Sequence, residues 1–457
     1  MAPPSLLLFA LATSPVQAEP PPTDTPTVTL QPRVEDAMLT PVPPAARNVK
    51  QWEEAVALMR ERSTDLRGAE AGVERATGRW RQALAALLPT ARVRAGLGQD
   101  LLHPSVPTGV LVGAVGDGRT VTTPTGTLTA TLTQTVVDLG AWRGVASARE
   151  AETGAVASLQ DTRRRLTLGL ARALVATVAS ERAAEINRVG LRRALERAAL
   201  ARRAFELGAG HQLDVVRVEQ DVAVARGILV AGDEQLRRTR EALGLALGYG
   251  EPFGVTPAFD LRGLVERTRA DCAPLDDVDA RADLVSARAQ VASARESRDQ
   301  ASAGYLPTLG LDSTLSGLTT TPGFGSFSTW SVAAVLSVPL WEGGGRGGLV
   351  RERAGVEAQA EATLESARRD VALEVARARR SVEVAETLTR TSVESRDLAE
   401  RTDRLTRRAF EVGRGTSLEL VQSGAALRQA ELDLVLREFE LVQARLDAFL
   451  TQARCDG

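Results

Sequence analysis

The sequence RRAFELGAGHQLDVV at residues 202–216 recurs as RRAFEVGRGTSLELV at residues 407–421. Nine of the fifteen aligned positions are identical, and Asp214 is matched by Glu419. Two other segments recur in the same order: Leu-Pro-Thr at 88–90 and 306–308, and a Gly- and Trp-containing corner at 137–143 and 341–346. Three ordered matches indicate a duplicated unit. Its period, near 205 residues, is too long for a solenoid repeat.

Each repeat opens with a predicted helix, at 50–88 in the first repeat and at about 279–304 in the second. Pro89 and Pro307 should end these helices, because proline cannot donate the next backbone hydrogen bond. A pair of strands is expected to follow in each repeat.

Alternating side chains predict these strands. Residues 127–136 carry Thr at every second position, and residues 330–340 carry an apolar side chain at every even-numbered position. Such a period of two indicates strands with one polar and one apolar face. The first strand of each pair has a weaker signal and is expected at 92–101 and 308–315. The loops that join the two strands of each pair are expected at 102–125 and 316–328.

A proline-free stretch rich in Ala, Arg, Glu and Leu follows each strand pair, from about 141 to 207 and from about 347 to 412. These are strong helix formers, and about 67 residues of helix extend for about 100 Å. Shorter return helices are expected at 213–248 and 417–452, after glycine breaks. The small Ala- and Val-rich stripes of these helices favour close, coiled-coil-like packing.

Composition excludes several functional classes. The 457 residues carry a formal charge of only -2, which gives no support for a nucleic-acid partner. Two Cys and two His are too few for a site of several Cys and His metal ligands. No stretch of about 18 apolar residues occurs, so no transmembrane helix is expected.

The order of segments predicts the domain organisation. A short apolar run before Val16-Gln17-Ala18 indicates a secretory signal peptide, although its first residues lack Lys and Arg; a disordered N-terminus is the alternative. No Cys follows the expected cleavage position, so a lipid anchor is not indicated. Eight of the 21 prolines lie in the next segment, which indicates an extended linker. The predicted units are a signal peptide (1–18), a Pro-rich linker (19–48), a first repeat (49–250), an inter-repeat segment (251–278), a second repeat (279–452) and a C-terminal tail (453–457).

Geometry then predicts a mixed α and β membrane protein. Strands of 10–14 residues can cross a bilayer when tilted, but four strands cannot close a barrel, and open sheet edges are not stable in lipid. Several chains must therefore share one barrel, and three chains would supply twelve transmembrane β-strands. The long antiparallel helical hairpins would project from one side as a tube, or α-barrel. The alternative is a soluble coiled-coil protein with two β-hairpin inserts.

The ordered set of duplication, Leu-Pro signals, strand-to-helix corners and helical tips resembles the TolC-like outer-membrane efflux proteins across nearly all of residues 50–452. The resemblance implies a homotrimer with a shared 12-stranded β-barrel in outer-membrane lipid and a helical barrel in the periplasm. The inter-repeat segment would belong to an equatorial belt. It also implies a passive exit duct, for efflux or type I secretion, with a periplasmic adaptor and an inner-membrane pump as partners and no cofactor. The rival functions are a periplasmic adaptor and a soluble structural coiled coil.

The resemblance also suggests functional residues at the tips. Asp214 and Glu419 would line the periplasmic aperture, where a ring of carboxylates favours cations. In the alternative interpretation they are acidic residues that stabilise a helix N-terminus. Some relatives carry a further acid where this chain has Gln422, and a tyrosine where it has Phe410. The glycines that would form the adaptor-docking surface, and that could adopt positive φ, are Gly208, Gly210, Gly413 and Gly415.

The remaining candidates carry weaker signals. The glycine run at 343–348 lacks the Lys-Ser/Thr ending of a phosphate-binding loop and is interpreted as a barrel-to-helix corner. His211 is interpreted as a solvated turn residue. Arg92 and Arg94 share one strand face and could favour anions. The sequence leaves open whether the two Cys pair. No nucleophile–base constellation occurs, so no catalysis is predicted.

Overall fold

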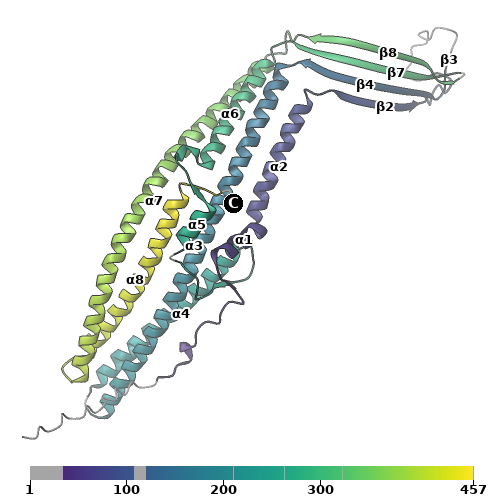
Figure 1. Cartoon of the computed structure of the whole chain (residues 1–457). Coiled ribbons are helices and arrows are strands. Elements are labelled where there is room, and N and C mark those ends of the chain that lie inside the picture. Colours follow the sequence, from purple (N-terminus) through teal and green to yellow (C-terminus); the bar gives the residue numbers. More distant parts are fainter. Residues whose placement is uncertain (1–33, 108–119, 209, 262, 322, 456–457) are drawn as a thin grey trace, which may run out of the picture.

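Two proline-free helices run along most of the helical part of the molecule (Figure 1). α3 (Leu139–Glu206) has 68 residues and α7 (Gly345–Glu411) has 67, so each is about 100 Å long at the usual helical rise. Each turns at one end of the molecule into a shorter return helix, α4 (Gln212–Ala246) or α8 (Ser417–Leu450). The two predicted long hairpins are confirmed.

The computed structural model describes residues 34–107, 120–208, 210–261, 263–321 and 323–455. The predicted signal peptide and the first part of the Pro-rich linker lie outside the described residues. None of the helices in the described part of the chain has an apolar stretch long enough to cross a membrane.

An antiparallel sheet extends from the other end of the helices (Figure 1). Its long strands are β2 (Thr90–Gly98), β4 (Thr125–Val137), β7 (Thr308–Thr321) and β8 (Gly323–Ser337), in that spatial order. A short strand, β3 (Thr120–Val121), pairs with the end of β7. The pairing of β4 with β7 joins the two repeats, so both strand pairs form one continuous sheet.

The sheet differs from the prediction at the second strand pair. The loop expected at 316–328 is mostly strand, because β7 continues to Thr321 and β8 begins at Gly323. Glycine and threonine in this stretch suggested a loop, but most of the described residues here have a cross-strand backbone partner, and this pairing outweighs the local preference.

The helix predicted at 50–88 is also interrupted. α1 (Trp52–Arg62) ends before Ser63, which has an extended ψ of 121°, and α2 (Thr64–Ala85) begins after it. The Ser63 hydroxyl accepts a hydrogen bond from the Leu66 amide at 3.2 Å and caps α2. The corresponding helix of the second repeat is α6 (Ala282–Ala303), close to its predicted bounds.

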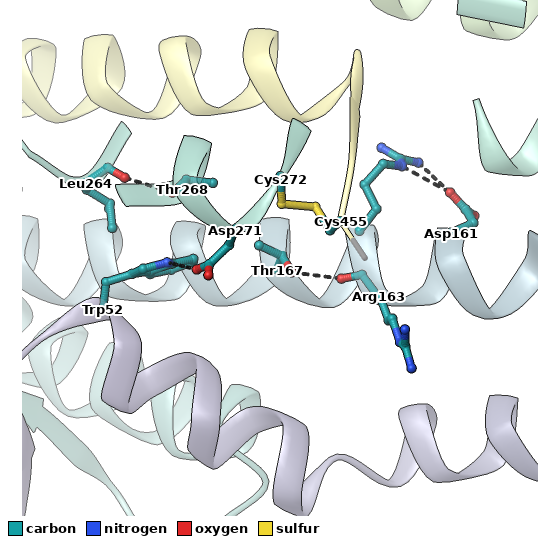
Figure 2. The surroundings of a disulfide bond; sticks show 10 residues. Trp52, Asp161, Arg163, Thr167, Leu264, Thr268, Asp271, Cys272 and Cys455 are labelled. Carbon is teal, nitrogen blue, oxygen red and sulfur yellow. Dashed lines mark hydrogen bonds and ion pairs between the residues drawn. A yellow bond between two sulfur atoms is a disulfide. The ribbon is translucent and has the colours of Figure 1, made fainter. Parts of the chain in front are cut away.

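The largest hydrophobic core among the described residues lies partway along α3 and is built from segments far apart in the sequence. Trp52 of α1 and Leu174 of α3 are fully buried in it, with side chains from α4 and α8. The inter-repeat segment contributes β5 (Phe253–Val255) and α5 (Leu264–Asp271). Trp52 donates its indole N–H to the Asp271 carboxylate at 2.7 Å (Figure 2).

The short elements of this region link the chain ends to the inter-repeat segment. β1 (Arg47–Val49) pairs in parallel with β5, and β6 (Ala273–Pro274) pairs with β9 (Ala453–Arg454). The remaining short elements are the 3-10 turns η1 (Ala37–Leu39) and η2 (Val278–Ala280). The two cysteines, whose pairing the sequence left open, form a disulfide beside β6 and β9 (Figure 2).

Residues 34–46 differ from the extended linker predicted there, because they contact the first hairpin. The Asp36 carboxylate pairs with Arg226 of α4 at 2.6 Å, and the Pro43 carbonyl accepts a hydrogen bond from Arg240 at 2.9 Å. Met38 and Leu39 pack against a core cluster of α3 and α4. The Arg226 guanidinium and the Met38 amide lower the pKa of Asp36, with the amide the larger cause.

Candidate functional site

The turn at each helical tip depends on one glycine with positive φ. Gly208 has φ 75° and Gly413 has φ 72°, in the left-handed region that glycine enters without a steric penalty. Each follows the last turn of its long helix, and the backbone N–H of each bonds to the carbonyl three residues earlier. The prediction of positive φ is confirmed for these two positions.

The second glycine of each turn is explained by lack of space for a side chain and not by its φ angle. Gly210 and Gly415 do not have positive φ. A Cβ at Gly210 would lie 3.2 Å from the Phe205 amide nitrogen, and one at Gly415 would lie 2.8 Å from the Phe410 amide nitrogen. The interpretation of these two residues as positive-φ glycines is wrong. They are small because the chain passes against the backbone of the preceding helix.

Asp214 lies in the first turn of α4, where its carboxylate accepts two hydrogen bonds and pairs with one arginine. The His211 amide donates to it at 3.3 Å, and Arg217 lies 3.9 Å away. The hydroxyl of Ser417, the first residue of α8, also donates to this carboxylate. Asp214 therefore caps its own helix and connects the tips of the two hairpins.

Glu419 occupies the equivalent position in α8 but is exposed. It forms a capping box with Thr416: the Thr416 amide donates to the Glu419 carboxylate at 3.0 Å, and the Glu419 amide donates to the Thr416 hydroxyl at 3.2 Å. The Thr416 amide, followed by its hydroxyl, lowers the pKa of Glu419. Both acids thus have the helix-capping role that the sequence allowed.

Apolar side chains are exposed around the tips. Leu207 is 73% exposed and Val412 is 69% exposed, each immediately before a positive-φ glycine. Leu213 and Leu418 are also exposed on the first turns of the return helices. Exposed apolar side chains beside a tight turn are typical of an interaction surface.

The sheet has two chemically distinct faces, and the pairing register defines them. One face carries the alternate Thr residues of β4, which align with Thr314 and Ser316 of β7 and with Ser331 and Thr329 of β8. The opposite face carries large apolar side chains that are exposed in the single chain, among them Val93, Leu132, Leu315, Trp330, Val332 and Leu336. An exposed apolar face of this size needs a nonpolar environment.

Only three charged residues lie in the five strands of this sheet, and all three lie on the polar face. Arg92 aligns with Thr131, Arg94 with Thr129, and Asp312 with Thr133. The sequence had placed the two arginines on one face. Asp312 was not predicted as a candidate. The alternation Leu309, Leu311, Ser313 along that strand nevertheless puts Asp312 on the other face from these three residues.

The weaker candidates have structural roles. His211 precedes the first residue of α4. Gly343 and Gly344 have φ of 62° and 82°, and Gly344 is the N-terminal cap of α7, in agreement with the predicted corner. Within the part of the chain that the structure describes, no group of three or more His, Cys, Asp or Glu residues could hold a metal ion.

Comparison with known proteins gives consistent results. The model of the outer membrane efflux protein family matches residues 55–249 and 278–448. The fold is similar to that of the outer membrane protein VceC of Vibrio cholerae, with a TM-score of 0.73, 17% identity and coverage of 88% of this chain and 95% of VceC. It is also similar to the CmeC outer membrane channel of Campylobacter jejuni, with a TM-score of 0.73, 12% identity and coverage of 89% and 86%.

A third similar structure is the MtrE outer membrane channel of Neisseria gonorrhoeae, with a TM-score of 0.69, 16% identity and 88% of each chain covered. No curated protein matches the sequence. The family match covers both repeats, and the structural likeness includes both the helical hairpins and the sheet. The chain belongs to the outer membrane efflux protein family.

Proposed function

We propose that three copies of this chain form a passive exit duct, which conducts substrates from an inner-membrane pump and a periplasmic adaptor to the outside of the cell. As an outer membrane efflux protein, the chain resides in the outer membrane and extends into the periplasm.

The observation that carries the proposal is the open sheet with two unlike faces. β2 pairs only with β4, and β8 pairs only with β7, so each has one edge without a partner among the described strands. Unpaired backbone groups are costly in lipid, and the apolar face requires lipid or protein. Pairing β8 of one copy with β2 of the next satisfies both edges, and three copies close a twelve-stranded barrel.

The tips supply the proposed contacts at the periplasmic end. The turns at Gly208–Gly210 and Gly413–Gly415, with exposed Leu207 and Val412 beside them, would dock the adaptor. Asp214 and Glu419 would line the aperture of the trimer. The hydrogen bond from Ser417 to Asp214 supports a coupled movement, because it joins the first turns of α4 and α8.

The assembly is tested with the full-length protein purified in detergent. We expect a trimer by native mass spectrometry and discrete conductance steps in planar bilayers. A monomer that stays in solution without detergent would contradict the duct and favour the soluble coiled-coil alternative. An inserted monomer without conductance would contradict the shared barrel.

The aperture residues are tested with Asp214→Ala and Glu419→Ala, separately and together. Loss of the carboxylates should raise ion leakage or reduce the preference for cations. Asp214→Asn and Glu419→Gln are the matched controls, because they remove charge and keep a side chain of similar size. Unchanged conductance and selectivity in all variants would reject the aperture role and leave both acids as helix caps.

A further inference from the structure

Arg92 and Arg94 lie on the polar face of the sheet among neutral neighbours. Along the row through Arg92, the aligned residues on β4, β7 and β8 are Thr131, Thr314 and Ser331. Along the row through Arg94, they are Thr129, Ser316 and Thr329. In these two rows, the residues aligned with Arg92 and Arg94 all carry a hydroxyl group.

No carboxylate neutralises the two arginines within the described structure. Neither takes part in an ion pair with a described residue. Asp312 shares their face, but it lies two strands away from Arg92 and in the adjacent row, which contains Thr133. The usual strand spacings put about 12 Å between the two residues. Each copy thus contributes two cations and one anion to the polar face of its strands.

Closure of the barrel would not add a carboxylate to this region. The free edge of β2, which carries both arginines, would pair with β8 of the neighbouring copy. β8 contains no Asp or Glu at any position, so this holds in every possible register. Three copies would place six guanidinium groups and three carboxylates in the lumen, with the arginines gathered in two adjacent rows.

We propose that Arg92 and Arg94 form a positively charged ring in the lumen of the strand barrel that attracts anions, and that the duct favours substrates carrying carboxylate or phosphate groups. This inference rests on the proposed function. The guanidinium fork suits these oxyanions, because it donates two parallel hydrogen bonds to them. Arg92 and Arg94 are about 7 Å apart along the strand, close enough to act on one anionic group.

The ring has the opposite sign to the acidic tips. Asp214 and Glu419 lie at the far end of the helices, about 100 Å away, well beyond the Debye length of about 10 Å at 0.1 M salt. The two charged regions therefore act independently. Removal of the arginines should shift the selectivity of the pore towards cations, whereas removal of the tip acids should shift it towards anions.

The test compares Arg92→Gln/Arg94→Gln with Arg92→Lys/Arg94→Lys, using reversal potentials under a KCl gradient in planar bilayers. For the glutamine pair, we expect the chloride-to-potassium permeability ratio to fall about twofold or more at about 0.1 M salt, and less at 1 M, where charges are screened. The lysine pair keeps the charge and should retain the wild-type ratio. Asp312→Asn removes the only acid of the described strands and should raise the ratio.

Binding of an anion provides a second measurement. Inorganic pyrophosphate added on the side of the strands should reduce the current of the wild type and of the lysine pair, and should have little effect on the glutamine pair. Channels that conduct with the same permeability ratio in all variants and show the same response to pyrophosphate would overturn the ring alone. A wild-type protein that opens no channel would overturn the duct and the ring together.

Discussion

Cys272 and Cys455 form a disulfide across a sequence separation of 183 residues, with their Cα atoms 4.2 Å apart. The bond joins the end of α5 to the segment after β9 (Figure 2). Both side chains are buried in a cluster with Leu450. It therefore ties the segment between the two repeats to the end of the second repeat. The β6–β9 pair lies directly beside it.

Replacement of both cysteines by serine should lower the free energy of unfolding by about 2–4 kcal/mol, because the disulfide restricts a long loop in the unfolded chain. The midpoint of thermal unfolding, followed by circular dichroism in detergent, should fall accordingly. A reductant that reaches the bond should lower the wild-type midpoint and leave the serine variant unchanged. Equal midpoints for the oxidised wild type and the variant would contradict the prediction.

Asp221→Asn should destabilise the junction of the two hairpins. The Asp221 carboxylate lies 2.6 Å from Arg197 of α3 and 3.9 Å from Arg428 of α8, and all three side chains are buried. Burial is the largest effect and lowers the pKa of Arg428; the charge of Asp221 opposes this shift, and the charge of Arg197 adds to it. Removing the single acid leaves two buried cations, which should cost about 3–5 kcal/mol of unfolding free energy.

Arg428→Met is the matched control for this cluster. It removes the second cation and keeps Arg197 paired with Asp221, so we expect a loss of about 1 kcal/mol or less. Thermal unfolding of both variants gives the comparison. A larger loss for Arg428→Met than for Asp221→Asn would show that Arg428, and not the acid, is the stabilising member.

The first turn of α8 should open in acid. The pKa of Glu419 is lowered from 4.5 in the folded protein, so its contribution to stability is present above pH 4.5 and is lost as the pH falls through the lower folded value. Hydrogen exchange of residues 416–420, corrected for the intrinsic pH dependence, should show protection that decreases as the pH falls below 4.5. Glu419→Gln should abolish this pH-dependent component; if it persists, another group is responsible.

The tip glycines should differ in their response to alanine. Gly208→Ala forces a left-handed backbone on a residue with a Cβ and should cost about 1–2 kcal/mol locally. Gly415→Ala brings its Cβ to 2.8 Å from the Phe410 nitrogen and requires the backbone to move, so its effect should exceed that of Gly210→Ala, where the distance is 3.2 Å. Hydrogen exchange at the turns measures this.

Gly227→Ala serves as the control for the glycine series. Gly227 lies within α4, and a Cβ there would meet no atom within 4 Å in the single chain. Alanine at this helical position should stabilise by up to about 1 kcal/mol. A destabilising effect would indicate that a second copy of the chain packs against this position.

The sequence allowed the helical hairpins to be predicted to within a few residues, because their signals are local. Proline-free runs of helix formers, the glycines after Leu207 and Val412, and the acids three residues into the return helices act within one or two turns. The break at Ser63 was missed, although Ser63 and Asp65 have the composition of a helix start. Strong helix formers on both sides of Ser63 favoured one continuous helix.

The duplicated unit, the length of the helices and the alternation of polar and apolar side chains were all predictable, because each follows from composition and spacing along the chain. The pairing of β4 with β7 and the disulfide between Cys272 and Cys455 came from tertiary packing alone. These contacts join residues far apart in the chain. Their register depends on how whole elements pack together, which no local pattern specifies.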